Sequence, residues 1–190
     1  MGSRGRFRVL ASGRGGLGVV ELGNLLAYRA ILRGRRASVV PTYGPQTRGG
    51  RVEVMVVEAP GSVDNPLPGE FDALIAVDAP ALESLHRVVD GGLVLYNGSL
   101  VAPRRVDRLR SFYVDGTRIA EEIGAGRLRE PRVLTSSVLF GAFVAALGDE
   151  GEMEAAVEAA LRGRPREIVE LNVEAALRGR EALRSLRRGG

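Results

Sequence analysis

Short apolar runs alternate with helical patterns through the first half of the chain, which predicts βαβ units and a largely parallel sheet. The expected strands are residues 7–11, 37–40, 51–57, 73–77, 93–96 and 112–114. Val52, Val54 and Val56 alternate with other positions, so we expect the strand 51–57 to bury one face. The continuous apolar run 73–77 is typical of a central parallel strand.

Apolar residues at helical spacing predict helices over residues 19–33, 80–89, 117–123, 133–147, 152–161 and 166–186. Gly34 is expected to end the first helix, Asp78 to cap the second, and Pro41 to close the strand 37–40. The sequence therefore predicts an α/β fold class. We expect a single Rossmann-like domain over residues 1–190, with a mostly parallel sheet flanked by helices and a helical C-terminal third.

The composition narrows the chemistry available to the chain. The chain has 190 residues, of which 45% are hydrophobic and 26% are charged, and these values fit one soluble globular domain. No apolar run approaches the length needed to span a membrane. The N-terminal segment lacks a signal peptide, so we expect a cytoplasmic protein. Without Cys and with one His, the chain offers no thiolate nucleophile, no iron–sulfur or Cys-ligated zinc site and few His-based metal sites, and neither a metal site nor a catalytic residue is predicted.

Two residue groups invite a catalytic interpretation that we do not favour. His86 is expected on the flank of a helix, and the pair Ser136 and Ser137 has no base partner that the sequence can name.

The formal net charge is +4, and every Lys or Arg in the chain is Arg. These arginines are spread along the whole sequence and interleaved with Glu, which is typical of an ion-paired surface. A basic RNA-binding module remains an alternative, but no basic arm with aromatic interleaving supports it.

A glycine motif of the pattern G-x-G-x-x-G lies directly after a predicted strand and at the start of a predicted helix. It comprises Gly13, Arg14, Gly15, Gly16, Leu17 and Gly18. Glycines permit a tight turn and close approach of a ligand, and the first N–H groups of a helix favour an anion such as a pyrophosphate. The alternative is a glycine turn that only packs the helix against the strand.

An NAD enzyme usually places an acid at the end of the second strand, and residues 38–42 contain none. Arg35, Arg36 and Ser38 lie nearby and could meet a phosphate on a ribose. This pattern keeps a freestanding NADP-dependent oxidoreductase as an alternative, and it suits coenzyme A equally well.

A second unusual segment, residues 42–50, follows the second strand, where open α/β sheets place ligands. Thr42 and Tyr43 begin it, and Arg48 precedes Gly49. Tyr43 offers a flat face with a hydroxyl group, and Arg48 could reach an anion or a partner carboxylate. The alternative is an ordered turn without a ligand.

With both segments in view, the sequence resembles the γ subunit, or γ domain, of 2-oxoacid:ferredoxin oxidoreductases. That family typically carries G-x-G-G-Q-G and S-Y-G-P-E-x-R-G-G, against GRGGLG at 13–18 and TYGPQTRGG at 42–50 here. The likeness continues through residues 63–66, 91–92, 97–100, 119–124 and 170–176. Leu17 stands where the family usually has Gln, and Gln46 where it usually has Glu.

The resemblance implies oxidative decarboxylation of a 2-oxoacid with coenzyme A, giving an acyl-CoA, carbon dioxide and reduced ferredoxin. Coenzyme A would bind partly on this chain, at Gly13, Arg14, Gly15, Gly16, Gly18, Thr42, Tyr43, Arg48 and Gly49. Thiamine diphosphate and the iron–sulfur clusters would belong to partner subunits: α, β and a ferredoxin-like δ. Because the chain has no Cys for clusters, we expect it to be inactive alone; its dispersed arginines and short apolar runs predict binding to neither nucleic acid nor membrane.

Overall fold

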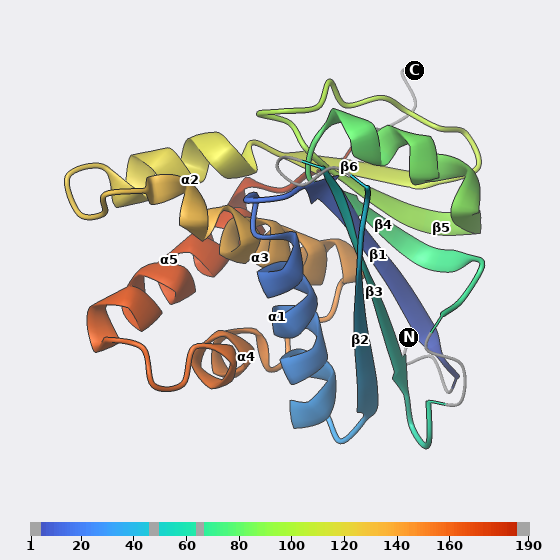
Figure 1. Ribbon diagram of the computed structural model, residues 1–190, viewed down its shortest axis with the longest axis horizontal. Coiled ribbons are helices and arrows are strands. Elements are labelled where there is room, and N and C mark those ends of the chain that lie inside the picture. The colour runs from blue at the N-terminus through green and yellow to red at the C-terminus, as the bar shows by residue number, and fades with distance from the viewer. Residues whose placement is uncertain (1–4, 46–49, 64–66, 186–190) are drawn as a thin grey trace.

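The fold is built on one seven-stranded sheet with the strand order β2-β3-β1-β4-β5-β6-β7 (Figure 1). The structure is a computed structural model that describes residues 5–45, 50–63 and 67–185. The strands are β1 (Phe7–Arg14), β2 (Arg36–Tyr43), β3 (Arg51–Ala59), β4 (Phe71–Ala76), β5 (Val88–Asn97), β6 (Arg110–Val114) and β7 (Arg184–Ser185). The helices are α1 (Val19–Leu32), α2 (Gly116–Gly124), α3 (Thr135–Leu147), α4 (Met153–Ala160) and α5 (Arg166–Ala182), with the 3-10 helices η1 (Ala79–Arg87) and η2 (Pro131–Leu134).

The sheet is mostly parallel, as predicted, but one strand interrupts the expected βαβ order. β1, β4, β5 and β6 pair in parallel, whereas β3 is antiparallel to both β1 and β2, and the short edge strand β7 is antiparallel to β6. β2 therefore points the same way as β1 without touching it. The pattern of residues 36–59 is that of two strands with a short connection, and such a connection can join only antiparallel strands.

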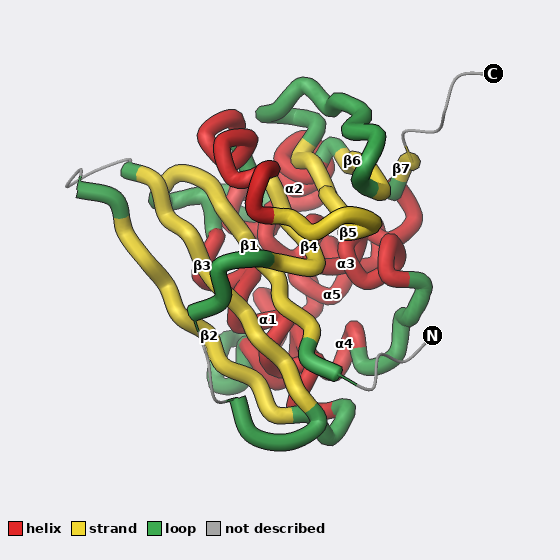
Figure 2. Tube along the Cα trace, turned by 90° about the vertical axis from the view of Figure 1, so that its right-hand side faces the viewer, coloured by secondary structure: helices red, strands yellow, loops and turns green. Residues whose placement is uncertain are grey.

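Five helices cover one face of the sheet, and the other face has a thinner cover. The apolar residues of α1 to α5 form one core with alternate positions of the central strands, and α1, α3, α4 and α5 lie together on one side in Figure 1. A second core lies between the opposite face, η1 and residues 100–109. Figure 2 shows β2 as the outermost strand of the sheet.

Several predicted elements need correction. The strand 51–57 is buried on both faces: Met55 packs in the second core with Leu85 of η1, Val57 is buried on the same face, and the alternating valines face the α1 side. β2 continues through Pro41 to Tyr43, since an edge strand can place proline's missing N–H on its unpaired side.

The predicted helix 80–89 is instead the 3-10 helix η1, and its last predicted residues already belong to β5. The last helix ends at Ala182 rather than at 186. Gly34 ends the first helix as expected: it has φ +73°, and its N–H donates to the carbonyl of Ile31. No helix in the described ranges is long and apolar enough to cross a membrane.

The helices α3 and α5 cross at two glycines. A Cβ on Gly141 would lie 1.8 Å from the carbonyl oxygen of Ala176, and a Cβ on Gly179 would lie 2.0 Å from that of Val138. The two backbones therefore touch directly, and no larger residue fits at either position. This contact fixes α5 against α3.

Candidate functional site

The glycine motif lies at the carboxyl end of β1, where the chain turns into α1. Gly13 is still in the strand and packs tightly, because a Cβ there would lie 2.9 Å from Cβ of Val77. Gly16 and Gly18 have φ values of +90° and +74°, which favour glycine. The fold itself therefore explains why Gly13, Gly16 and Gly18 are glycines. Gly15, in contrast, is exposed and has room for a side chain.

The hydrogen bonds of the turn show which donors remain for a ligand. The N–H of Gly15 donates to the carbonyl of Gly50 at 2.9 Å, which ties the turn to the start of β3. The first helical bond runs from the N–H of Leu22 to the carbonyl of Gly18, and Gly18 supplies no side-chain cap. The donors at this helix start are therefore the amides of the first turn of α1, not that of Gly15.

A hollow of about 250 Å³ opens at this turn. Its lining comprises Arg14, Gly15, Gly16, Gly18, Val19, Val20, Glu21, Tyr43 and Val52. The structure therefore brings four residues of the glycine motif together with Tyr43 of the second segment. Tyr43 is 69% exposed at the end of β2, so its ring is accessible to a ligand.

The other predicted site residues lie elsewhere. Gly13 is buried in the strand below the turn. Thr42 lies on the opposite face of the sheet, where its hydroxyl group donates to the carbonyl of Glu53 at 3.4 Å. Arg48 and Gly49 fall outside the described residues.

Arg35 and Arg36 do not approach the glycine turn. They lie at the beginning of β2, whose start pairs with the end of β3, while the turn lies beside the start of β3. Arg35 instead forms an ion pair with Glu58 at 3.3 Å. The expectation that these two arginines neutralise a phosphate at the turn is therefore wrong.

The charges at the hollow come from Arg14 and Glu21. Nε of Arg14 donates to Oδ2 of the buried Asp78 at 2.5 Å. Burial raises the pKa of Glu21, and the charge of Arg164 acts in the opposite direction. Leu17 turns toward the main core, so the residue that replaces the usual Gln packs rather than facing the hollow.

Asp78 does not have the capping role expected from the sequence. It occupies the N-cap position of η1, yet its side chain makes no capping hydrogen bond. Its carboxylate is fully buried and is used for Arg14 instead. The sequence signal for this pair was weak, because 64 residues separate the partners.

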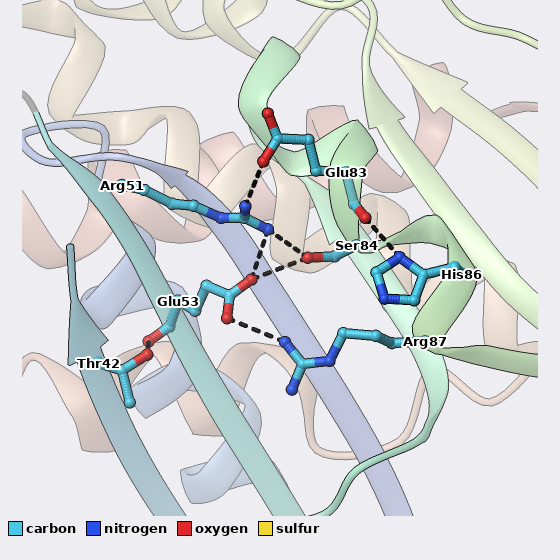
Figure 3. Close-up of polar contacts among 7 residues, drawn as sticks. All are labelled: Thr42, Arg51, Glu53, Glu83, Ser84, His86 and Arg87. Atoms are coloured by element: carbon cyan, nitrogen blue, oxygen red, sulfur yellow. Dashed lines mark hydrogen bonds and ion pairs between the residues drawn. The ribbon is translucent and has the colours of Figure 1, made fainter.

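A second polar cluster lies on the opposite face of the sheet, between β3 and η1 (Figure 3). Arg51 donates to Glu83 and to Glu53, each at 2.7 Å, and Arg87 donates to Glu53 at 3.0 Å. Ser84 donates to Glu53 at 2.8 Å. Although burial acts to raise it, the Ser84 hydrogen bond and the charges of Arg51 and Arg87 hold the pKa of Glu53 below its usual value.

This cluster has matched positive and negative groups and contributes no nucleophile. The alternating pattern of the strand 51–57 does not connect Arg51 and Glu53 to η1. His86 is exposed, as expected, with Nδ1 2.7 Å from the carbonyl oxygen of Glu83. Ser137 donates to the amide oxygen of Asn172 at 2.7 Å, so it is a structural hydroxyl group.

These features define the class as a single α/β domain with helices on the sheet and a helical C-terminal part. Its glycine turn lies at the carboxyl edge of a mostly parallel sheet, and the sequence that carries the turn also carries a second motif beside it. The family model for pyruvate ferredoxin/flavodoxin oxidoreductase matches residues 8–182. The chain belongs to this family.

Curated relatives agree with the family and differ in length. Ketoisovalerate oxidoreductase subunit VorA of Methanothermobacter marburgensis is 32% identical over 167 residues, which cover 87% of this chain and 34% of VorA. The chain thus spans about a third of that relative. The 2-oxoglutarate synthase subunit KorC of the same organism is 28% identical, with 94% of this chain and 97% of KorC covered.

Solved structures show the same fold. The γ subunit of a keto/oxoacid ferredoxin oxidoreductase from Geobacter sulfurreducens is 30% identical with a TM-score of 0.78, covering 94% of this chain and 96% of that subunit. A 2-oxoglutarate:ferredoxin oxidoreductase from Magnetococcus marinus, solved with 2-oxoglutarate, coenzyme A and succinyl-CoA, has a TM-score of 0.79 at 17% identity. This chain covers 31% of that longer protein, whose likeness concerns the fold alone.

Proposed function

We propose that this chain is the γ part of a 2-oxoacid:ferredoxin oxidoreductase and holds part of coenzyme A in the hollow at the glycine turn. The observation that carries the proposal is the meeting of Arg14 and the glycines with Tyr43 around one hollow. A turn that served packing alone would not require the second segment beside it. The amides of α1 and the guanidinium of Arg14 supply donors for a phosphate, and Tyr43 supplies an aromatic face.

The size of the hollow bears on assembly. Pockets that enclose a drug-sized ligand usually have roughly 300 to 1,000 Å³. The hollow here has about 250 Å³ and can accommodate only part of coenzyme A. Partner subunits would enclose the rest, so the isolated chain should bind coenzyme A weakly and the complex tightly.

The oxidative chemistry would lie outside this chain. Among the described residues, no three His, Asp or Glu side chains gather as metal ligands do. In this proposal α and β subunits supply thiamine diphosphate, a ferredoxin-like δ subunit supplies iron–sulfur clusters, and ferredoxin accepts the electrons. The role of this chain is to position the acyl acceptor, and the isolated chain has no oxidoreductase activity.

The strand order argues against the NADP alternative. A dinucleotide-binding fold places its second strand beside the first, so that the ribose lies close to the pyrophosphate turn. Here β3 intervenes, and two strand spacings of about 4.8 Å separate β1 from β2. The end of β2 also carries Thr42 and Tyr43, which offer no charge for a ribose phosphate.

The ion pairs of the arginines argue against the RNA-binding alternative, which was suggested by the basic charge of the chain. Many arginines pair with carboxylates across the described surface, as Arg127 does with Glu174 at 2.9 Å and Arg132 with Glu121 at 2.7 Å. A surface whose cations are already paired gains less from binding phosphates.

The Gly15→Val variant tests the proposal in the reconstituted complex. A Cβ at Gly15 would make only ordinary contacts, 3.7 Å from the Gly50 oxygen and from Cγ2 of Val52. The fold should therefore tolerate Val, while its methyl groups obstruct a ligand at the turn. We expect the KM for coenzyme A to rise at least about tenfold, which corresponds to about 1.4 kcal/mol.

Gly61→Val is the matched control, because a Cβ at Gly61 meets nothing within 4 Å. Both variants should keep the thermal midpoint of the wild type. Gly16 is a poorer test position, since its φ of +90° would add backbone strain to any obstruction. A Gly15→Val complex with unchanged KM for coenzyme A would contradict the proposal.

A further inference from the structure

The Arg14–Asp78 pair occupies the point where the connections of the sheet reverse direction. The chain leaves β1 toward α1 and β2 on one side, and it leaves β4 toward η1 and β5 on the other. β1 and β4 are parallel neighbours, and the N–H of Val77, the residue after β4, donates to the carbonyl of Ser12 near the end of β1. Open α/β sheets bind ligands outside the carboxyl ends of their strands at such a point.

Burial differs sharply between the two partners. The side chain of Asp78 is 0% exposed, while that of Arg14 is 58% exposed. A buried carboxylate is costly without a cation, and Arg14 supplies that cation through Nε at 2.5 Å. Asp78 therefore ties one end of an exposed guanidinium to the interior of the protein.

The fold makes no other use of the Asp78 side chain among the described residues. It does not cap η1, and its Oδ1 is buried without a hydrogen-bond partner. Buried polar atoms in native proteins are nearly always paired, so an exception calls for an explanation. Asp78 thus serves the guanidinium of Arg14.

A second arginine, Arg51, lies directly opposite Arg14 on the neighbouring strand, and the two are bound differently. Arg14 and Arg51 are register partners on β1 and β3, and like charges directly opposite each other are unfavourable. Glu83, Glu53 and Ser84 take up the guanidinium of Arg51 (Figure 3). Among the described residues, Arg14 is bound only through Nε, to Asp78, which leaves its two terminal nitrogens for an acceptor at the carboxyl edge of the sheet, where Arg14 also lines the hollow.

We propose that Asp78 is a positioning residue that holds Arg14 at the mouth of the hollow, so that the terminal nitrogens of Arg14 receive a phosphate of coenzyme A. This inference rests on the proposed function and deepens it. The buried carboxylate fixes the guanidinium before the ligand arrives, so little side-chain freedom is lost on binding. The opposite charge of Asp78 also prevents the two facing arginines from repelling each other strongly.

The test is a double-mutant cycle on the reconstituted complex, with the KM for coenzyme A and kcat measured separately. Arg14→Gln removes the positive charge and the paired terminal nitrogens of the guanidinium, but the Gln amide can still donate a hydrogen bond to Asp78. Asp78→Asn keeps the size and removes the charge. We expect Arg14→Gln to raise the KM for coenzyme A at least about tenfold, with kcat within about twofold of wild type.

Asp78→Asn should raise the same KM by about threefold or more. If Asp78 acts only through Arg14, the double variant should match Arg14→Gln within about twofold. The double variant also places an amide opposite an amide, so it leaves no unpaired buried charge and keeps the cycle interpretable if Arg14→Gln alone is unstable. Arg166→Gln is the control, since Arg166 forms an exposed ion pair with Glu170 on α5.

An Arg14→Gln complex with the wild-type KM would overturn the inference. Independent, multiplying effects of the two single variants would overturn the positioning role of Asp78. The failure of the proposed function is distinguishable: there, Gly15→Val would also leave the KM unchanged. If Gly15→Val raises the KM while Arg14→Gln and Asp78→Asn do not, coenzyme A binds at the turn without this pair.

Discussion

The crossing of α3 and α5 gives the sharpest test of the fold, through the variant Gly141→Ala. The new Cβ would lie 1.8 Å from the carbonyl oxygen of Ala176, and real Cβ contacts essentially never fall below 3.0 Å. One helix must therefore move by about 1.2 Å, against a core that includes the fully buried Phe140 and Phe143. Overpacking of a dense core typically costs about 1 to 3 kcal/mol, and a backbone atom cannot move aside as a side chain can.

Alanine also has a higher helix propensity than glycine, which returns about 1 kcal/mol. With a gross cost at or above the upper end of that range, we expect a net loss of about 2 kcal/mol or more, and 2 kcal/mol corresponds to a fall in Tm of roughly 4 to 8 °C for a chain of this size. The measurement is urea unfolding followed by far-UV circular dichroism. Gly61→Ala is the control and should stay within about 0.5 kcal/mol of wild type. A Gly141→Ala protein as stable as wild type would refute the backbone contact between the two helices.

Two further variants test interior charges. Arg29→Met should destabilise the fold by about 2 to 4 kcal/mol in urea unfolding, because the buried guanidinium donates to the carbonyls of Asp149 at 2.5 Å and Gly151 at 3.1 Å; an unchanged midpoint would refute that role. Glu53→Gln should destabilise by about 1 to 2 kcal/mol at pH 7. Because the folded-state pKa of Glu53 is lowered, its contribution is present above the unfolded pKa and is lost as the pH falls through the folded value. The difference from wild type should therefore shrink below about pH 4, and a difference independent of pH would contradict the ion-pair account.

The elements that periodicity predicted well are those whose local pattern agrees with their packing. α1 was predicted at Val19 and ends within one residue of its predicted end, because an apolar face and Gly34 both specify it. The strand 73–77 was recognised as central because it is buried on both sides. Each of these signals is contained in a short window of sequence.

The failures concern information that no short window contains. Nothing in the run 51–57 states that it lies between β1 and β2, so the pairing of β3 was missed. The segment 80–89 carries a helical apolar pattern, yet it spans a short gap between two parallel strands as the 3-10 helix η1. Asp78 was likewise predicted to cap the following helix from its local position, but its side chain forms an ion pair with the distant Arg14 instead.

The candidate site was predictable in part. The glycine motif and Tyr43 could be named because turns and motifs are local, and the structure brings them around one hollow. The misplacement of Arg35 and Arg36 followed from reading them as near a strand end, when they lie at the start of β2. The cluster of Arg51, Glu53 and Ser84 depends on the β3 pairing and could not be seen without it.

The most direct test of the central claim is titration calorimetry of coenzyme A and of NADPH into the reconstituted complex, with wild-type and Gly15→Val chains. We predict that coenzyme A binds the wild-type complex, that Gly15→Val weakens this binding at least about tenfold, and that NADPH gives no saturable heat. Tight binding of NADPH without binding of coenzyme A, or full coenzyme A affinity in the Gly15→Val complex, would contradict the assignment of the glycine turn to coenzyme A.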